Sequence, residues 1–321
     1  MDTEKKTPAL SVILLAPDRY ETIRRTVGHL RNQTVSDRIE LVIVAPSAQQ
    51  LGLNRDECEG LCGVSIAECD PANSVAAARA CGIRMATAPV IAVGEDHSYP
   101  RPNWGEALLR AHQQPWGAVG PVLWNANPGL ISWSNFLIAY GPWIGPAVSG
   151  VVGNLSEHNS SYKRALLQEL DGDLDKLLER QGELHRALQA RGHQLYLEVE
   201  AETDHFNFST LGVSMVLRFH AGRAFGAERA RVNRWSLGRR LIYTAGVGFI
   251  PWMRLRYVLK EIKRMQHRFG LILRILPVLI LLLSAAAIGE VTGYLFGAGQ
   301  SKQALDRFEF SGANLAKRGR R

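Results

Sequence analysis

The sequence predicts an α/β fold with a mostly parallel, doubly wound sheet, followed by a C-terminal membrane-associated helical region. Two patterns predict the sheet: short apolar runs that suit strands buried on both faces, and amphipathic stretches with helical spacing between them. A third observation predicts the helical region, because residues 275–298 form a 24-residue apolar stretch with Glu290 as its lone charge. A helix of that length, roughly 36 Å, is long enough to cross a bilayer.

The first element is the run "ALSVILLA" at residues 9–16, which predicts a buried strand. Ile23, Val27 and Leu30 follow at spacings of four and three, and this spacing predicts a helix that packs one stripe on the sheet. Ligands bind beyond the carboxyl ends of the strands in such a sheet. The same alternation predicts strands at 39–45, 64–69, 90–94 and 116–124 and helices at 74–87 and 104–114.

The next part of the chain changes to longer amphipathic segments. Residues 161–170, "SYKRALLQEL", predict one helix, and residues 174–192 predict another that Gly192 ends. Residues 194–201, "QLYLEVEA", predict a strand that leads to His205. We therefore place the catalytic or binding domain at residues 1–230.

From Arg231 onward the composition indicates a membrane surface. The predicted divisions are a basic juxtamembrane segment (231–270), a transmembrane or interfacial helix (271–298) and a basic tail (299–321). Within the first, residues 241–253 are apolar but short and contain Pro251, which suits an interfacial or re-entrant segment. Residues 218–229, with His220, Arg223 and Arg229, predict a loop that faces headgroups, or else a phosphate contact.

The charge pattern favours anionic lipids over nucleic acid as the partner of the C-terminal third. The net charge is +8, the basic clusters border apolar stretches, and no nucleic-acid-binding motif is present. Basic residues before the apolar stretch outnumber those just after it, which predicts a membrane protein whose main domain lies on the cytoplasmic face. The residues before it are Lys260, Lys263, Arg264, Arg268 and Arg274, and those after it are Lys302 and Arg307.

The chemistry-bearing residues follow the predicted strand at 90–94. Glu95, Asp96 and His97 stand where this strand reaches the ligand-binding edge of the sheet, and His205 ends a later strand. Carboxylates and imidazoles can hold a divalent ion and leave positions for phosphate oxygens. An acidic turn after a strand is also often merely solvated, and His205 can equally be a hydrogen-bonded histidine at a strand end.

Residues 9–225 resemble the family 2 glycosyltransferases, which use nucleotide sugars and have the Rossmann-like GT-A fold. The matching stretches are "SVILLAPDRYETIRRTVGHLRNQT", "NSVAAARACGIRMATAPVIAVGEDHSYPRPNW", "HNSSYKRALL" and "GELHRALQARGHQLYLEVEAETDHFN". The resemblance implies inverting transfer of a sugar from a nucleoside-diphosphate donor to an acceptor, with Mg²⁺ or Mn²⁺ as cofactor. The apolar C-terminal stretch adds a lipid-linked or cell-envelope acceptor and membrane lipids as expected partners.

The resemblance also implies roles for particular residues. Those at the metal are Glu95, Asp96, His97 and His205; those at the nucleotide sugar are Pro17, Arg79, Glu95 and Asp96; and those on the acceptor side are Asn159, Lys163 and Arg164. Each has a plainer interpretation. Arg79 suits a solvent-facing helix charge, Asn159 a helix N-terminus, and the other two cations a solvated face.

Three departures from the family pattern matter for function. His97 replaces the last aspartate of the family's D-x-D, and imidazole favours softer ions than Mg²⁺. Ala45, Pro46 and Ser47 replace the acidic turn that would contact the nucleotide base. The family's catalytic Glu-Asp pair is missing, because the matching positions are Arg180 and Gln181.

Glu183 is therefore the predicted general base, with Glu179 one turn earlier on the same predicted helix face. Glu183 can instead be a surface acid that pairs with Arg186 or Arg180. The degraded motifs leave a second function open, a non-catalytic nucleotide- or glycan-binding membrane subunit with the same fold. A metal-dependent phosphohydrolase built on His97 and His205 is a remote third, because a second cluster of ligands is lacking.

Overall fold

The computed structural model describes residues 7–179, 182–264 and 269–309. The chain forms two compact units, a sheet unit and a helical unit. The sheet unit comprises the described residues up to Trp124 together with Trp143–His205, and the helical unit comprises Asn125–Pro142 and the described residues from Phe206 onward. Three residues named in the sequence analysis lie outside the described residues, namely Arg180, Gln181 and Arg268. The end of the basic tail, "AKRGRR", lies outside them as well.

The sheet unit is built on a nine-stranded sheet with the order β3-β2-β1-β4-β8-β6-β9-β5, in which β7 also pairs with β9. Strands β3, β2, β1 and β4 are parallel, whereas β8 pairs antiparallel with both β4 and β6, and β9 pairs antiparallel with β5 and β7. The strands are β1 (Leu10–Leu15), β2 (Ile39–Ala45), β3 (Gly63–Glu68), β4 (Val90–Val93), β5 (Ser98–Pro100), β6 (Ala118–Asn125), β7 (Gly150–Val152), β8 (Ser161–Lys163) and β9 (Leu195–His205).

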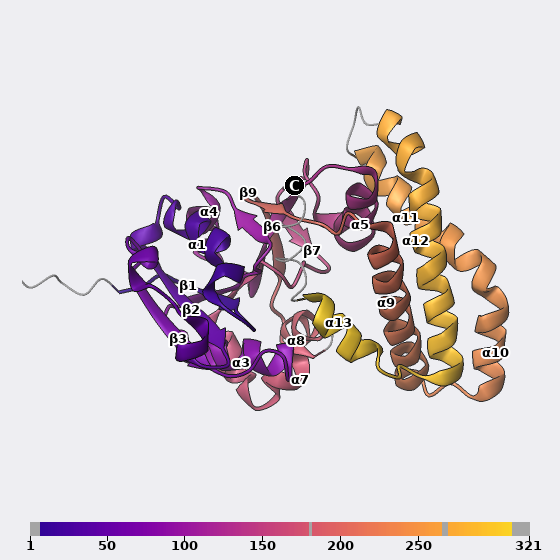
Figure 1. Cartoon of the computed structure of the whole chain (residues 1–321), viewed down its shortest axis with the longest axis horizontal. Helices are drawn as coiled ribbons and strands as arrows, with labels where there is room; N and C mark the ends of the chain where they lie inside the picture. The colour runs from indigo at the N-terminus through magenta and orange to yellow at the C-terminus, as the bar shows by residue number, and fades with distance from the viewer. Residues whose placement is uncertain (1–6, 180–181, 265–268, 310–321) are drawn as a thin grey trace, which may run out of the picture. The chain divides into compact units, whose positions relative to one another are not determined.

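Helices cover both faces of the parallel strands, which confirms the predicted α/β class (Figure 1). Leu10, Val12 and Leu14 of β1 belong to a buried cluster with side chains of α1 and α4. Ile13 points to the opposite face, where a Cβ added to Gly82 of α3 would lie 2.6 Å from its Cγ2. The helices of this unit are α1 (Arg24–Arg31), α2 (Ala48–Leu51), α3 (Val75–Met85), α4 (Trp104–Ala111), α6 (Arg164–Glu169), α7 (Leu174–Leu178) and α8 (Glu183–Ala190).

Two predicted helices of the sheet unit are wrong in detail. Residues 161–170 start as strand β8, because Ser161, Tyr162 and Lys163 pair with β4, and only then continue as α6. Residues 174–192 form two helices, α7 and α8, instead of one. The residue before α8 is Gly182, with φ of +78°, a left-handed conformation that glycine adopts without steric cost. Glu179 and Glu183 therefore do not share a helix face.

The helical unit contains α5 (Leu130–Tyr140), α9 (Leu211–Val232), α10 (Leu237–Ala245), α11 (Phe249–Arg264), α12 (Phe269–Phe296) and α13 (Ser301–Glu309). Residues 218–229 lie inside α9, so the predicted headgroup-facing loop is a helix. The predicted boundary at residue 230 also falls within α9. The interfacial segment predicted at 241–253 consists of the end of α10, a short turn and the start of α11.

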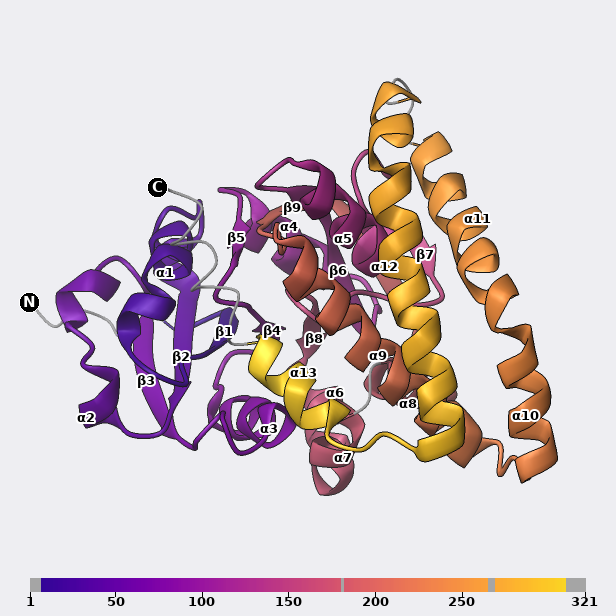
Figure 2. The same ribbon diagram turned by 45° about the vertical axis from the view of Figure 1, so that its right-hand side comes forward.

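Helices α9 and α12 pack with their backbones in contact, and α11 lies beside α12 (Figure 2). Added Cβ atoms on Gly222 and Gly226 of α9 would lie 2.0 and 2.2 Å from the carbonyl oxygens of Ala286 and Glu290. An added Cβ atom on Gly289 of α12 would lie 2.0 Å from Phe219 O. The contacts advance in the same direction along both helices, so α9 and α12 are parallel, and small residues at four-residue spacing allow this approach.

Residues Gly270–Phe296 of α12 are long and apolar enough to cross a membrane, with a mean hydropathy of 2.6 over the window that qualifies. Large apolar side chains are also exposed on α10 and α11, including Ile242 (72% exposed) and Phe249 (71%). The predicted C-terminal apolar helix is thus present, and it weakly suggests membrane association.

Candidate metal centre

The turn after β4 carries Glu95, Asp96 and His97, and it is held against β1 and α1. Gly94 N donates to Ile13 O at 2.9 Å, so the chain stays beside β1 for one residue beyond the strand. The Thr26 hydroxyl of α1 then donates to the carbonyl oxygens of Glu95 (3.1 Å) and Asp96 (3.0 Å). This anchoring fixes the direction in which the three side chains leave the backbone.

Strand pairing brings His205 to the same place. Strand β5 starts at Ser98, directly after His97, and pairs antiparallel with the end of β9, where Ser98 lies opposite His205. The imidazole rings of His97 and His205 are consequently neighbours, with centroids 4.9 Å apart and planes inclined by 73°. Residues separated by more than a hundred positions meet because of this register.

A third histidine, His158, joins the group from the segment before β8. Asn159 N donates to Val93 O at 2.6 Å and Val93 N donates to Ser160 O at 3.1 Å, so the β4–β8 pairing extends to the turn. His158 Nδ1 is 2.9 Å from Oε1 of Glu95. We did not predict His158 from the sequence, because its position depends on β8 being an antiparallel strand beside β4.

Glu95, His97 and His205 form a group of potential metal ligands whose ligand atoms all lie within 4.8 Å of one another. Among the described residues, no other group of three or more potential ligands converges in this way. Nε2 of His97 is 4.0 Å from Oε1 of Glu95, and Nε2 of His205 is 3.4 Å from Oε2. All three side chains are buried.

Asp96 supports this group from outside it. Its Oδ1 is 2.5 Å from Nδ1 of His97, so the carboxylate holds the ring by one nitrogen and leaves Nε2 facing Glu95. Carboxylates that bind a ligating histidine in this way fix the ring orientation and increase its basicity. The structure therefore places Asp96 behind His97, whereas the sequence predicted a direct ligand.

The charges around Glu95 favour its ionised form. Burial acts to raise the pKa of Glu95, but the neighbouring His158 and His97 outweigh it and hold the pKa well below its usual range. Burial lowers the pKa of His205, which keeps that imidazole neutral and able to ligate a metal. Oε2 of Glu95 is buried and makes no hydrogen bond among the described residues, as expected of an oxygen that would bind an ion.

Arg79 and Pro17, predicted at the nucleotide sugar, lie at this edge of the sheet. Arg79 on α3 is 7% exposed, so it is not the solvent-facing charge of the plainer interpretation. Its Nη2 is 3.2 Å from Nδ1 of His158, next to Glu95. Pro17 is half-buried two residues beyond the end of β1, which is parallel to β4. These positions suit a donor pocket at the carboxyl ends of the strands.

The residues predicted on the acceptor side do not converge. Asn159 is buried and donates from Nδ2 to the Ser98 hydroxyl at 2.7 Å, which ties the His158 segment to β5. Lys163 pairs with Val90 at the start of β4, so the length of the strand separates it from the Glu95 turn. Its Nζ donates to Gln114 O at 2.8 Å, and Arg164 follows it at the same end of the strand.

Glu183 begins α8 and pairs with Arg186, with Oε1 and Nη2 3.0 Å apart. A second carboxylate lies at the same helix start, because Gly182 N donates to Oε1 of Glu157. Glu157 directly precedes His158 in the chain, and no sequence pattern indicated where its carboxylate lies. This position can be seen only in the folded structure, because Glu157 and Gly182 come together through the return of the chain after β8.

Comparison with known proteins agrees with the fold. Residues 11–171, half of the chain, match the family model described as glycosyl transferase family 2. The chain therefore belongs to the family 2 glycosyltransferases, enzymes that transfer a sugar from a nucleotide-sugar donor to an acceptor. No curated protein shows significant similarity to it.

Proposed function

We propose that this glycosyltransferase is membrane-associated, inverting and dependent on a divalent metal, and that its acceptor is lipid-linked or part of the cell envelope. The observation that supports this most directly is the convergence of Glu95, His97 and His205 at the ligand-binding edge of a family 2 sheet. That edge is where a nucleotide diphosphate binds in open α/β sheets.

The residues present suit a divalent cation such as Mn²⁺ or Mg²⁺. One ionised carboxylate and two imidazoles provide three ligands, and Oε2 of Glu95 lacks a hydrogen-bond donor among the described residues. A bound divalent ion supplies Lewis-acid neutralisation of the departing diphosphate. Asp96 would hold His97 in place, and Arg79 would add positive charge near the phosphates from α3.

Inversion requires one displacement, in which the acceptor oxygen bonds to the anomeric carbon as the bond to the nucleoside diphosphate breaks. A carboxylate must take the proton of the acceptor hydroxyl. We assign this role to Glu183 at the start of α8. Glu157 is the competing candidate, because its carboxylate reaches the same helix start and its neighbour His158 contacts Glu95. Glu179 lies beyond α7 on a separate element.

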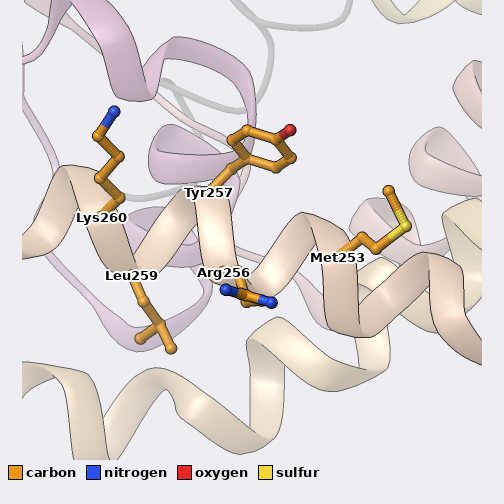
Figure 3. A pocket seen from close by; sticks show the side chains of 5 residues that line it. All are labelled: Met253, Arg256, Tyr257, Leu259 and Lys260. Carbon is orange, nitrogen blue, oxygen red and sulfur yellow. The ribbon is translucent and has the colours of Figure 1, made fainter.

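The lipid character of the acceptor rests on the helical unit. Besides the apolar α12, helix α11 presents basic and apolar side chains together around a surface hollow of about 570 Å³, lined by Met253, Arg256, Tyr257, Leu259 and Lys260 (Figure 3). Exposed apolar side chains interspersed with cations suit the headgroup region of an anionic membrane. We place the sheet unit on the cytoplasmic face of that membrane.

The test of activity uses the full chain in detergent with a panel of nucleotide sugars, a polyprenyl-phosphate acceptor and Mn²⁺. We expect release of the nucleoside diphosphate with transfer of the sugar, loss of both on addition of EDTA, and a product of inverted anomeric configuration. Nucleotide binding without turnover of any donor, unaffected by EDTA, would instead support the non-catalytic binding subunit.

The base is identified by Glu183→Gln and Glu157→Gln in the same assay. We expect the replacement of the true base to lower kcat by about 10²–10⁴-fold while donor KM changes little. The other variant serves as the matched control, since both substitutions remove a carboxylate at the start of α8. Equal, small effects of both would contradict a base at this helix start.

Membrane association is tested by flotation of the full chain with vesicles that contain phosphatidylglycerol. We expect the chain to float with the vesicles after the detergent is removed. Met85 provides a control for nonspecific hydrophobic adsorption to the vesicles, because it is an exposed apolar side chain (40% exposed) on α3 of the sheet unit. Met85→Glu should leave flotation unchanged, and Phe249→Glu should weaken it. A wild-type chain that stays in the bottom fraction would contradict the proposal.

A further inference from the structure

The metal centre combines two nitrogen ligands with one carboxylate, and this donor set differs from an all-oxygen site. We propose that the centre selects ions that bind imidazole well, Mn²⁺ and above all Co²⁺ or Zn²⁺, and discriminates against Mg²⁺. The inference rests on the proposed metal dependence and adds to it the residues that set metal selectivity, His97 and His205.

The first step of the argument is the chemistry of the ligands. Mg²⁺ prefers carboxylate, phosphate and water oxygens and gives up its waters reluctantly. Imidazole suits the transition ions from Fe²⁺ to Zn²⁺, and their affinity for a given nitrogen and oxygen site rises from Mn²⁺ towards Cu²⁺. With one carboxylate among three ligands, the centre offers Mg²⁺ little and offers Co²⁺ or Zn²⁺ two favourable nitrogens.

The second step is that the carboxylate nearest in sequence is already engaged. Asp96 Oδ1 contacts Nδ1 of His97 at 2.5 Å, so this acid orients the imidazole. Asp96 would therefore act as an outer carboxylate that strengthens His97 as a nitrogen ligand. An Mg²⁺ site would gain more from Asp96 as a direct ligand.

The third step is that the site is preformed and closed. Glu95, His97 and His205 are at most 7% exposed, and two of them are fixed by strand pairing at Ser98. The 3.4 Å between His205 Nε2 and Glu95 Oε2 is longer than a good hydrogen bond, and this oxygen has no hydrogen-bond donor among the described residues. Two atoms that share an ion have such a separation, so the spacing supports co-ligands better than an ion pair.

The experiment measures metal binding directly on the full chain after removal of bound metal with EDTA. Calorimetric titrations with MnCl₂, CoCl₂, ZnCl₂ and MgCl₂ should give a Kd for Mn²⁺ at least tenfold below that for Mg²⁺, and a lower Kd still for Co²⁺ and Zn²⁺. Pulsed EPR of bound Mn²⁺ should show magnetic coupling to nitrogen nuclei from two imidazoles.

Variants connect the selectivity to the residues. His97→Asp converts the set to two carboxylates and one imidazole, and it should narrow the ratio of Mg²⁺ to Mn²⁺ Kd values at least tenfold. Asp96→Asn should weaken Co²⁺ binding by about 10–100-fold, because it removes the carboxylate that orients His97. His193→Gln, at a histidine outside the centre, should leave the ratio unchanged.

The possible failures are distinguishable. Equal affinity of the wild-type chain for Mg²⁺ and Mn²⁺, or a Mn²⁺ spectrum without nitrogen coupling, would overturn the selectivity and leave the metal dependence intact. An unchanged ratio in a folded His97→Asp variant would also overturn it. Absence of binding by all four ions would overturn both this inference and the metal part of the proposed function.

Discussion

Two buried glutamates, one in each unit of this protein, have opposite surroundings. Glu95 in the sheet unit is 5% exposed and lies among three imidazoles, those of His97, His158 and His205. Glu290 in the helical unit is 2% exposed and is bound by Arg229 and Arg254. Both carboxylates are buried. The histidines around Glu95 can exchange protons and bind metals near neutral pH, whereas the arginines around Glu290 cannot.

The comparison separates a functional charge from a structural one. Arginine stays protonated and has no lone pair for a metal, so the pairing of Glu290 with two guanidinium groups, and with the Tyr294 hydroxyl, is permanent. Imidazole is neutral over much of the physiological range and then offers a lone pair. The surroundings of Glu95 can therefore accept a divalent ion, whereas those of Glu290 hold α9, α11 and α12 together.

The largest expected effect comes from exchanging charge for amide at each glutamate. Glu95→Gln should lower Mn²⁺ affinity at least 100-fold and sugar transfer at least 10³-fold, because it removes the one charged ligand of the centre. Glu290→Gln should leave the Mn²⁺ affinity unchanged. It should instead destabilise the helical unit by about 1–3 kcal/mol, less than for a fully buried pair because Arg229 and Arg254 keep some exposure to solvent.

Calorimetry with MnCl₂ and thermal denaturation of the full chain in detergent measure these two quantities on the same samples. The comparison would fail if Glu290→Gln weakened Mn²⁺ binding as strongly as Glu95→Gln does. It would also fail if Glu95→Gln left Mn²⁺ binding intact.

Local sequence patterns were sufficient for the parallel half of the sheet. The run at 39–45 matches β2 residue for residue, and the helix expected at 74–87 forms as Val75–Met85. These elements have a continuous apolar run or a regular stripe, so their pattern depends on near neighbours alone. Glu95 and His97 were found for the same reason, because they directly follow such a run.

Elements that form through contacts with residues distant in the sequence were not predicted from local patterns. Strand β8 is three residues long and exists through its pairing with β4 and β6, so "SYKRALLQEL" looked helical. His158 and Glu157 were missed with it. Helix α9 was missed because its histidine and arginines were interpreted as a headgroup-facing loop. The local signal for the helix contact was the four-residue spacing of Gly222 and Gly226, which pack against the backbone of α12.

The next prediction sharpens the contrast between side-chain and backbone contacts. Gly289→Ala would place a Cβ 2.0 Å from Phe219 O, and backbone cannot move aside as a flexible side chain can. We expect a loss of about 2–4 kcal/mol in the stability of the helical unit, near the upper end of overpacking effects. Gly270→Ala on the same helix is the matched control, since an added Cβ there meets no atom within 4 Å.

That control should be neutral or slightly stabilising, by up to about 1 kcal/mol, because alanine favours helix over glycine. Thermal denaturation in detergent compares the two variants. Equal stability of both would show that α9 and α12 can separate at no cost, and would remove the close approach as the feature that holds the unit. Mn²⁺ affinity should be unchanged in both.

The smallest effect concerns histidines of the sheet unit that lie outside the metal centre. Burial, together with the charge of Lys163, lowers the pKa of His112 to about 4, and a hydrogen bond with Ser161 opposes this shift. Burial, with the charge of Arg186, lowers the pKa of His185 to about 4 as well. Burial therefore keeps both rings neutral, and they form hydrogen bonds with Ser161, Tyr162 and Asn154.

The sign of the pH effect follows from these shifts. Well above pH 6.5 neither the folded nor the unfolded chain protonates these rings, so the full stability is present. Between pH 6.5 and about 4 the unfolded chain binds protons that the folded chain refuses. The free energy of unfolding should therefore fall by up to about 1.4 kcal/mol per pH unit for each histidine. Urea denaturation of the sheet unit from pH 7.5 to 5 in EDTA should show this slope.

His185→Gln tests whether His185 stays neutral in the folded chain. The test compares how the free energy of unfolding changes with pH, so it remains valid even if the variant is less stable than the wild type at every pH. Its free energy of unfolding should fall less steeply with decreasing pH than that of the wild type, by up to about 1.4 kcal/mol per pH unit below pH 6. The difference between the two slopes should shrink towards pH 7.5, which provides the internal control. Identical slopes across the whole range would show that His185 binds a proton as readily in the folded chain as in the unfolded chain, and that its burial does not exclude the charge.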